Sequence, residues 1–190
     1  MKVARSAVLL FSVTLMGCGS PAVSDYTTSR DSLFYLQQLK PATVSIGKFT
    51  DLSGFSWAHT RLEFGCSLPN IQQNEDHLEP AAYLQSAFVA ELMATSAVSQ
   101  IPVEPQIRGE LTTLSLEKGI LFDGVWTVEL VLISSNGQEL RTHQEYGFDT
   151  GALFGPTICH RAGEHFEPAV RSLLEKAIQS PDFLLLIQQG

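Results

Sequence analysis

The chain has 190 residues and a formal net charge of −8, from 12 basic and 20 acidic side chains. This length suits one domain with a real core, and 44% hydrophobic with 17% charged residues exclude a disordered chain. An acidic surface repels phosphate groups, so the composition also argues against nucleic-acid binding.

The first residues have the features of a secretory signal. Lys2 and Arg5 precede an apolar run, residues 7–16, which is too short to span a membrane. The run ends at the sequence Leu-Met-Gly-Cys, residues 15–18, which resembles the lipobox of bacterial lipoproteins. The resemblance implies that residues 1–17 are a signal peptide and that Cys18 becomes the first mature residue and the lipid anchor. An ordinary secretory signal with a buried cysteine is the alternative.

In that family, the residue after the lipidated cysteine influences whether the lipoprotein stays in the inner membrane or moves to the outer membrane. Gly19 stands where an aspartate tends to retain a lipoprotein in the inner membrane. The resemblance therefore implies an outer-membrane lipoprotein that is anchored through Cys18 and faces the periplasm. The signal contains two of the basic residues and none of the acidic ones, so the mature chain is more acidic still.

Cys66 and Cys159 remain if Cys18 carries lipid. An even number of cysteines in an oxidising compartment favours a disulfide between them. Two unpaired small core residues are the alternative.

Residues 18–40 are expected to form the anchor and a tether, because residues 19–30 are polar with few large apolar groups. Residues 31–40 contain three leucines at helical spacing before Pro41, and they predict either a short helix or an extended arm: Leu33, Leu36 and Leu39.

Residues 41–190 are expected to form a single periplasmic domain. Alternation predicts a strand over residues 42–49, and residues 50–79 lack strong periodicity. A loop of that length in a compact domain is usually functional or pinned, for example by a disulfide. A helix is expected over residues 80–98, because apolar residues recur on one face and Pro80 suits a first turn.

The second half of the chain predicts strands and then a helix. A strand is expected over residues 107–117 with a bulge near Thr113, followed by a hairpin of residues 125–134 and 138–148. A two-residue turn would set apolar residues opposite charged ones, whereas a three-residue turn with Gly137 left-handed sets Leu132 opposite Leu140 and Leu130 opposite Thr142.

One more helix and an apolar tail complete the chain. An unbroken apolar stripe predicts a helix over residues 164–179. Residues 183–187 are apolar throughout, and we expect them in the core rather than in an exposed contact.

This order of elements predicts a two-layer α+β sandwich, in which a mostly antiparallel sheet of about four strands packs two main helices on one face. In pattern only, residues 42–180 resemble the small periplasmic domains of the TolB amino terminus, LpoB, YajG and LptE. The resemblance implies an envelope protein partner and no catalysis.

The chemical motifs are weak. Cys159, His160 and His165 are near one another, but their spacing matches no strong metal motif, and we expect no metal and no cofactor. Nucleophile-elbow and phosphate-loop motifs are absent from the sequence, so we expect no enzyme.

The expected function is that of a non-enzymatic accessory subunit that binds a protein of the cell envelope. The contact surface is expected on the free sheet face and in the long loop, where aromatic, histidine and arginine side chains suit an interface: Trp57, His59 and Arg61. The alternative is a transport auxiliary lipoprotein that carries lipid or lipopolysaccharide between helices and sheet.

Overall fold

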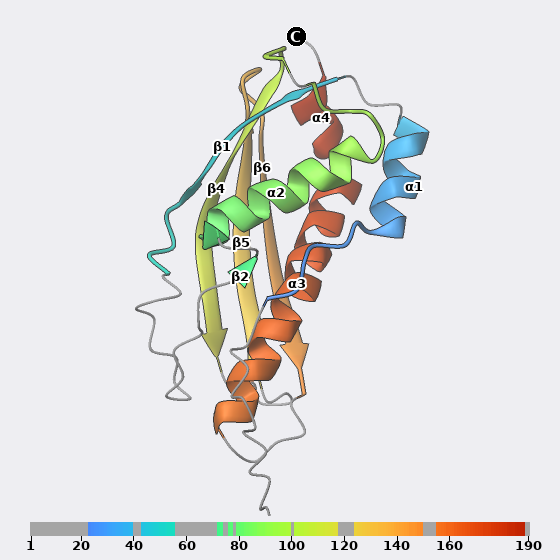
Figure 1. The fold of residues 1–190 in the computed structure, drawn as a ribbon. Coiled ribbons are helices and arrows are strands. Elements are labelled where there is room, and N and C mark those ends of the chain that lie inside the picture. Colours follow the sequence, from blue (N-terminus) through green and yellow to red (C-terminus); the bar gives the residue numbers. More distant parts are fainter. Residues whose placement is uncertain are drawn as a thin grey trace, which may run out of the picture.

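The computed structural model describes residues 23–39, 43–55, 72–73, 76–77, 79–99, 101–117, 124–149 and 155–188, with side chains except in residues 72–73, 76–77 and 155–160. The main sheet has four strands in the order β1-β4-β5-β6, and the helices lie on one of its faces (Figure 1). The predicted two-layer α+β fold is therefore confirmed.

The strands of the main sheet are mostly antiparallel. They are β1 (Ser45–Asp51), β4 (Gln106–Glu117), β5 (Gly124–Ser134) and β6 (Glu139–Phe148). Only the β1–β4 pair is parallel. Two further strands, β2 (Gln72–Gln73) and β3 (Asp76–His77), pair only with each other.

The helices are α1 (Arg30–Leu39), α2 (Pro80–Met93), α3 (Gly155–Gln179) and α4 (Phe183–Ile187). Helix α2 packs on β1 and β4, while α3 packs on β5 and β6. Helix α1 packs on α2 and α3. Of the two structures that the sequence allowed for this segment, a short helix or an extended arm, the helix is therefore the one found. Within the described ranges, no helix has both the length and the apolar character that a membrane crossing requires.

The predicted hairpin register is confirmed. Leu132 lies opposite Leu140 and Leu130 opposite Thr142, and Gly137 has a φ of +89° in the turn. The left-handed conformation favours glycine there, because it has no side chain to clash with the backbone. The register of β4 against β5 shifts between Leu111 and Thr113, as the alternation predicted.

Two predicted helix boundaries are wrong. Helix α2 ends at Met93 rather than at residue 98, because Ser96 turns the chain with a φ of +59° and Val98 instead bridges to Val44. Helix α3 begins at Gly155, nine residues before the predicted start, and includes Pro168.

The core lies between the sheet and the helices and consists mostly of aliphatic side chains, with aromatic rings that meet across the layers. Trp126 of β5 packs against Phe166 of α3 with ring centroids 5.1 Å apart, and Phe88 of α2 meets Phe183 of α4 at 6.4 Å. All four side chains are fully buried. Leu186 and Ile187 are buried as well, so the predicted packing of the apolar tail is confirmed.

A glycine allows the edge strand to approach the core. Phe49 of β1 lies opposite Gly109 of β4, and a Cβ atom on Gly109 would lie 2.6 Å from the Phe49 ring. The missing side chain therefore makes room for the ring, which also contacts Phe88.

The described part of the predicted tether lies against the domain. Val23 and Ser29 are buried, and the segment crosses α3 before it enters α1 (Figure 1). Polar composition alone did not indicate this packing, because its partners are two glutamates of distant helices, Glu91 and Glu167.

Candidate interaction surface

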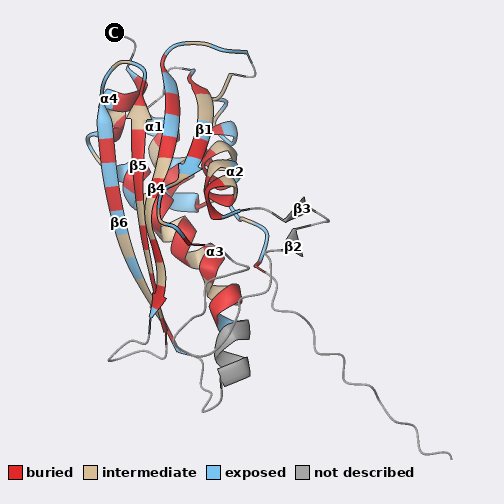
Figure 2. Ribbon diagram, turned by 90° about the vertical axis from the view of Figure 1, so that its left-hand side faces the viewer, coloured by how far each residue is buried: buried red, intermediate tan, exposed pale blue. Residues whose placement is uncertain are grey.

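The face of the sheet opposite the helices presents a repeated arrangement of side chains, which we call the outer face. Strand alternation sends every second residue of β4, β5 and β6 to this face. Buried and exposed bands accordingly alternate along these strands (Figure 2). The four described helices lie on the other face, so no described helix separates the outer face from another molecule.

The middle strand contributes apolar groups to the outer face, and its neighbours contribute charges. Ile133 of β5 lies between Arg108 of β4 and Glu139 of β6. Two residues earlier on β5, the pattern repeats with the charges reversed: Val131 lies between Glu110 of β4 and Arg141 of β6. Val131 is only 4% exposed although it lies on this face.

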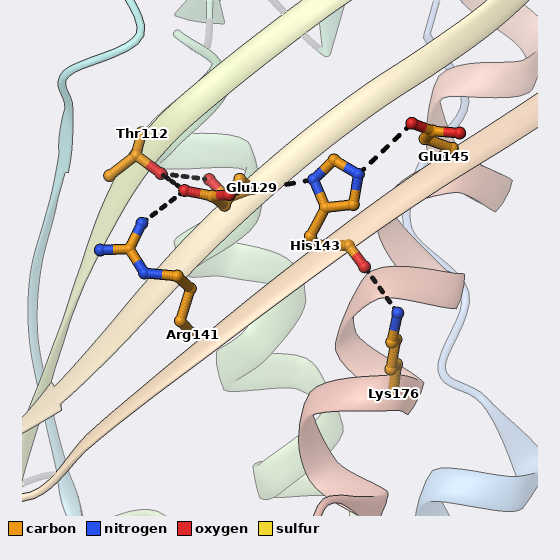
Figure 3. Close-up of polar contacts among 6 residues, drawn as sticks. All are labelled: Thr112, Glu129, Arg141, His143, Glu145 and Lys176. Atoms are coloured by element: carbon orange, nitrogen blue, oxygen red, sulfur yellow. Dashed lines mark hydrogen bonds and ion pairs between the residues drawn. The ribbon is translucent and has the colours of Figure 1, made fainter.

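Glu129 connects three strands through its carboxylate. Thr112 of β4 donates a hydrogen bond to Glu129 Oε1 over 2.7 Å, and Arg141 of β6 donates to the same oxygen over 2.5 Å (Figure 3). The hydrogen bond from Thr112 and the adjacent Arg141 guanidinium lower the pKa of Glu129 below its ordinary value. Glu129 is therefore a fixed negative charge at neutral pH.

His143 lies between two carboxylates on the same face. Its Nδ1 is 3.9 Å from Glu129 Oε2, and its Nε2 is 3.6 Å from Glu145 Oε1 (Figure 3). Its exposed fraction is 47%, against 70% for Glu145. Exposed pairs of this kind contribute little to stability, about 0–1 kcal/mol, so they do little to hold the fold together.

The open edge of β6 is partly covered by α3. Lys176 donates a hydrogen bond over 2.8 Å to the backbone carbonyl of His143 (Figure 3). A lysine at a sheet edge blocks pairing with a further strand. A partner is therefore expected on the outer face rather than along this edge.

Most of the site residues predicted from the sequence lie outside the described residues. These are Cys18, Cys66, Trp57, His59 and Arg61. Their lipidation, pairing and contact roles stay predictions.

The structure places all three residues of the weak metal-ligand cluster, Cys159, His160 and His165, in helix α3. Cys159 and His160 belong to the helix, but their side chains are not described. His165 stacks on Phe148 with centroids 4.8 Å apart and an interplanar angle of 14°. Burial lowers the pKa of His165, so it is a neutral packing group at neutral pH. Among the described side chains, no group of three or more potential metal ligands comes together.

The individual residues of the outer face were not identified from the sequence, although the free sheet face was. Glu129, Arg141 and His143 are on adjacent strands, and only the register brings them together. The hairpin register was predictable, and the same register places Glu129 opposite His143, so this pair could have been predicted from the sequence.

No protein-family model matches the chain, and no curated protein matches it in sequence. Among solved structures, it is similar to the crystal structure of protein XCC0632 from Xanthomonas campestris, of family model DUF330. The similarity covers 83% of this chain and 90% of that chain, with 12% sequence identity and a TM-score of 0.46.

Proposed function

We propose that the protein is an outer-membrane lipoprotein that faces the periplasm and binds another protein of the cell envelope without catalysing a reaction. The outer face carries this proposal: the buried Val131 and the half-buried Ile133 of the middle strand each lie between one acidic and one basic residue of the neighbouring strands. Apolar centres with polar, partly charged surroundings are typical of protein interfaces.

The lipobox resemblance at residues 15–18 supports the membrane part of the proposal. Several acyl chains on Cys18 would anchor the protein stably, since each buried CH₂ contributes about 0.8 kcal/mol. Trp57, His59 and Arg61, which lie outside the described residues, remain predicted contact residues.

The described core favours a binding protein over a lipid carrier. A carrier needs an apolar space between helices and sheet. Here rings of the two layers touch directly, as Trp126 and Phe166 do at 5.1 Å and Phe49 and Phe88 at 5.9 Å.

Two substitutions test the two parts of the proposal. Cys18→Ala should release the protein into the soluble periplasmic fraction, and wild-type protein should incorporate labelled fatty acid. If the Cys18→Ala protein still fractionates with membranes and the wild type carries no label, the anchor is refuted.

Ile133→Asp should abolish capture of the partner while leaving the melting temperature nearly unchanged. Leu185→Asp is the matched control, because Leu185 is an exposed leucine on α4, 45% exposed and outside the outer face. Equal loss of capture in both variants would count against the outer face as the interface.

A further inference from the structure

Residues 23–29, which we call the strap, are attached to the helix layer by four hydrogen bonds. The Tyr26 hydroxyl donates to Glu91 Oε1 over 2.5 Å, and the Ser29 amide donates to the same oxygen over 2.7 Å. The Thr27 amide donates to Glu167 over 3.2 Å, and the Tyr83 hydroxyl donates to the Ser24 carbonyl over 3.0 Å.

The two carboxylates that receive the strap are themselves buried. Glu91 of α2 is 0% exposed and Glu167 of α3 is 6% exposed. Arg171 lies 3.5 Å from Glu167, whereas Glu91 has no salt bridge to a described residue. Burial of a carboxylate costs free energy unless hydrogen bonds satisfy its oxygens. The strap amides and the Tyr26 hydroxyl supply such bonds, so the strap and the two glutamates stabilise each other.

The strap is fixed at both of its ends. Val23 is buried at its start, and Ser29 caps α1 at its end by accepting hydrogen bonds from the amides of Asp31 and Ser32. Leu36 then anchors α1 with a fully buried side chain. The whole segment from residue 23 to residue 39 therefore belongs to the folded unit.

We propose that the docked strap holds the domain close to the membrane, with its helix layer on the membrane side. The proposal rests on the lipid anchor at Cys18 proposed above. Cys18 precedes Val23 by five residues, and five extended residues span at most about 18 Å. Release of the strap up to Arg30 would raise that limit to about 43 Å. Because the strap docks on the helix layer, the outer face is left on the opposite side, open to a partner.

The first test follows hydrogen exchange in acylated full-length protein in vesicles of phosphatidylethanolamine and phosphatidylglycerol. The Thr27 and Ser29 amides should exchange at least tenfold more slowly than in an unstructured peptide, and Glu91→Ala should remove this protection. Ser24→Ala is the control, because Ser24 is exposed and takes part through its backbone carbonyl.

The second test measures the distance between protein and bilayer by neutron reflectometry on a supported bilayer of the same lipids. Wild-type protein should lie no farther than about 18 Å from the headgroups. Ten Gly/Ser residues inserted between Ser20 and Pro21 should increase the distance between protein and headgroups while the strap amides stay protected.

Rapid exchange of both amides in acylated wild-type protein would overturn the docking. Equal reflectivity profiles with and without the insertion would overturn the claim that the short segment before the docked strap limits the distance between domain and membrane. Either result would leave the anchor itself intact. Protein that carries no acyl group and does not bind the bilayer would instead refute the proposed function, and with it the membrane role of the strap.

Discussion

Tyr26 and Glu91 are joined by a hydrogen bond of 2.5 Å although they are 65 residues apart in the sequence. The bond connects a polar segment near the N-terminus to the last turn of helix α2. It makes the N-terminal segment part of the domain.

Tyr26→Phe should lower the free energy of unfolding by about 2 kcal/mol, because a hydrogen bond to a buried carboxylate is lost. Urea unfolding followed by circular dichroism measures the change. Tyr35→Phe is the control, since Tyr35 is a partly buried tyrosine of α1 outside the Glu91 cluster. Equal stability of Tyr26→Phe and wild type would show that this hydrogen bond does not stabilise the fold.

Glu91 should make the stability of the domain depend on pH. Burial raises its pKa above the ordinary value of 4.5, and Glu175 adds to this, while the hydrogen bonds from Tyr26 and Ser29 and the charge of Arg171 act against it. The folded state therefore binds a proton more tightly than the unfolded state. The stability contributed by this group is fully present below pH 4.5 and is lost as the pH rises through the folded pKa.

The measurement compares urea unfolding of wild type and Glu91→Gln over a pH series. The stability of wild type relative to the variant should increase as the pH falls. Glu117→Gln removes one exposed charge of β4 and controls for net charge. A relative stability that increases with pH would contradict the raised pKa.

Much of the fold follows from local patterns in the sequence. The facing of Leu132 and Leu140 was predictable, because a slip of one residue would bury Arg141, His143 and Glu145. The strap was not predictable. Its sequence is polar, so no hydrophobic pattern indicates that it packs. The groups that hold it, Glu91 and Glu167, are far away in the sequence and belong to two other helices, α2 and α3. The early start of α3 was missed for a local reason, since Gly155 and Pro156 are typical of a loop.

Gly109→Ala should destabilise the domain by about 1–3 kcal/mol, because the new methyl group would overlap the ring of Phe49. Gly47→Ala is the control, since its Cβ would meet only the flexible side chain of Gln106 at 3.3 Å. Adding Phe49→Leu to Gly109→Ala should cost less than the sum of the two single changes, because the residues are in contact. Additive losses in thermal unfolding would argue against the overlap.

The predicted disulfide between Cys66 and Cys159 can be mapped by mass spectrometry of a non-reducing peptic digest. Linked peptides are expected, and reduction should lower stability by up to about 4 kcal/mol in the chain-entropy model, since the closed loop is long. Two free thiols in protein isolated under alkylating conditions would refute the pairing.

Photocrosslinking in intact cells tests the central claim most directly. A photoreactive amino acid at position 133 of β5 samples the outer face, and the same amino acid at position 185 of α4 is the control. The proposed function predicts one discrete adduct with an envelope protein from position 133, which is lost when Arg141→Ala is added, and no such adduct from position 185. Equal adducts from both positions, or an adduct from position 185 alone, would contradict an interface on the outer face.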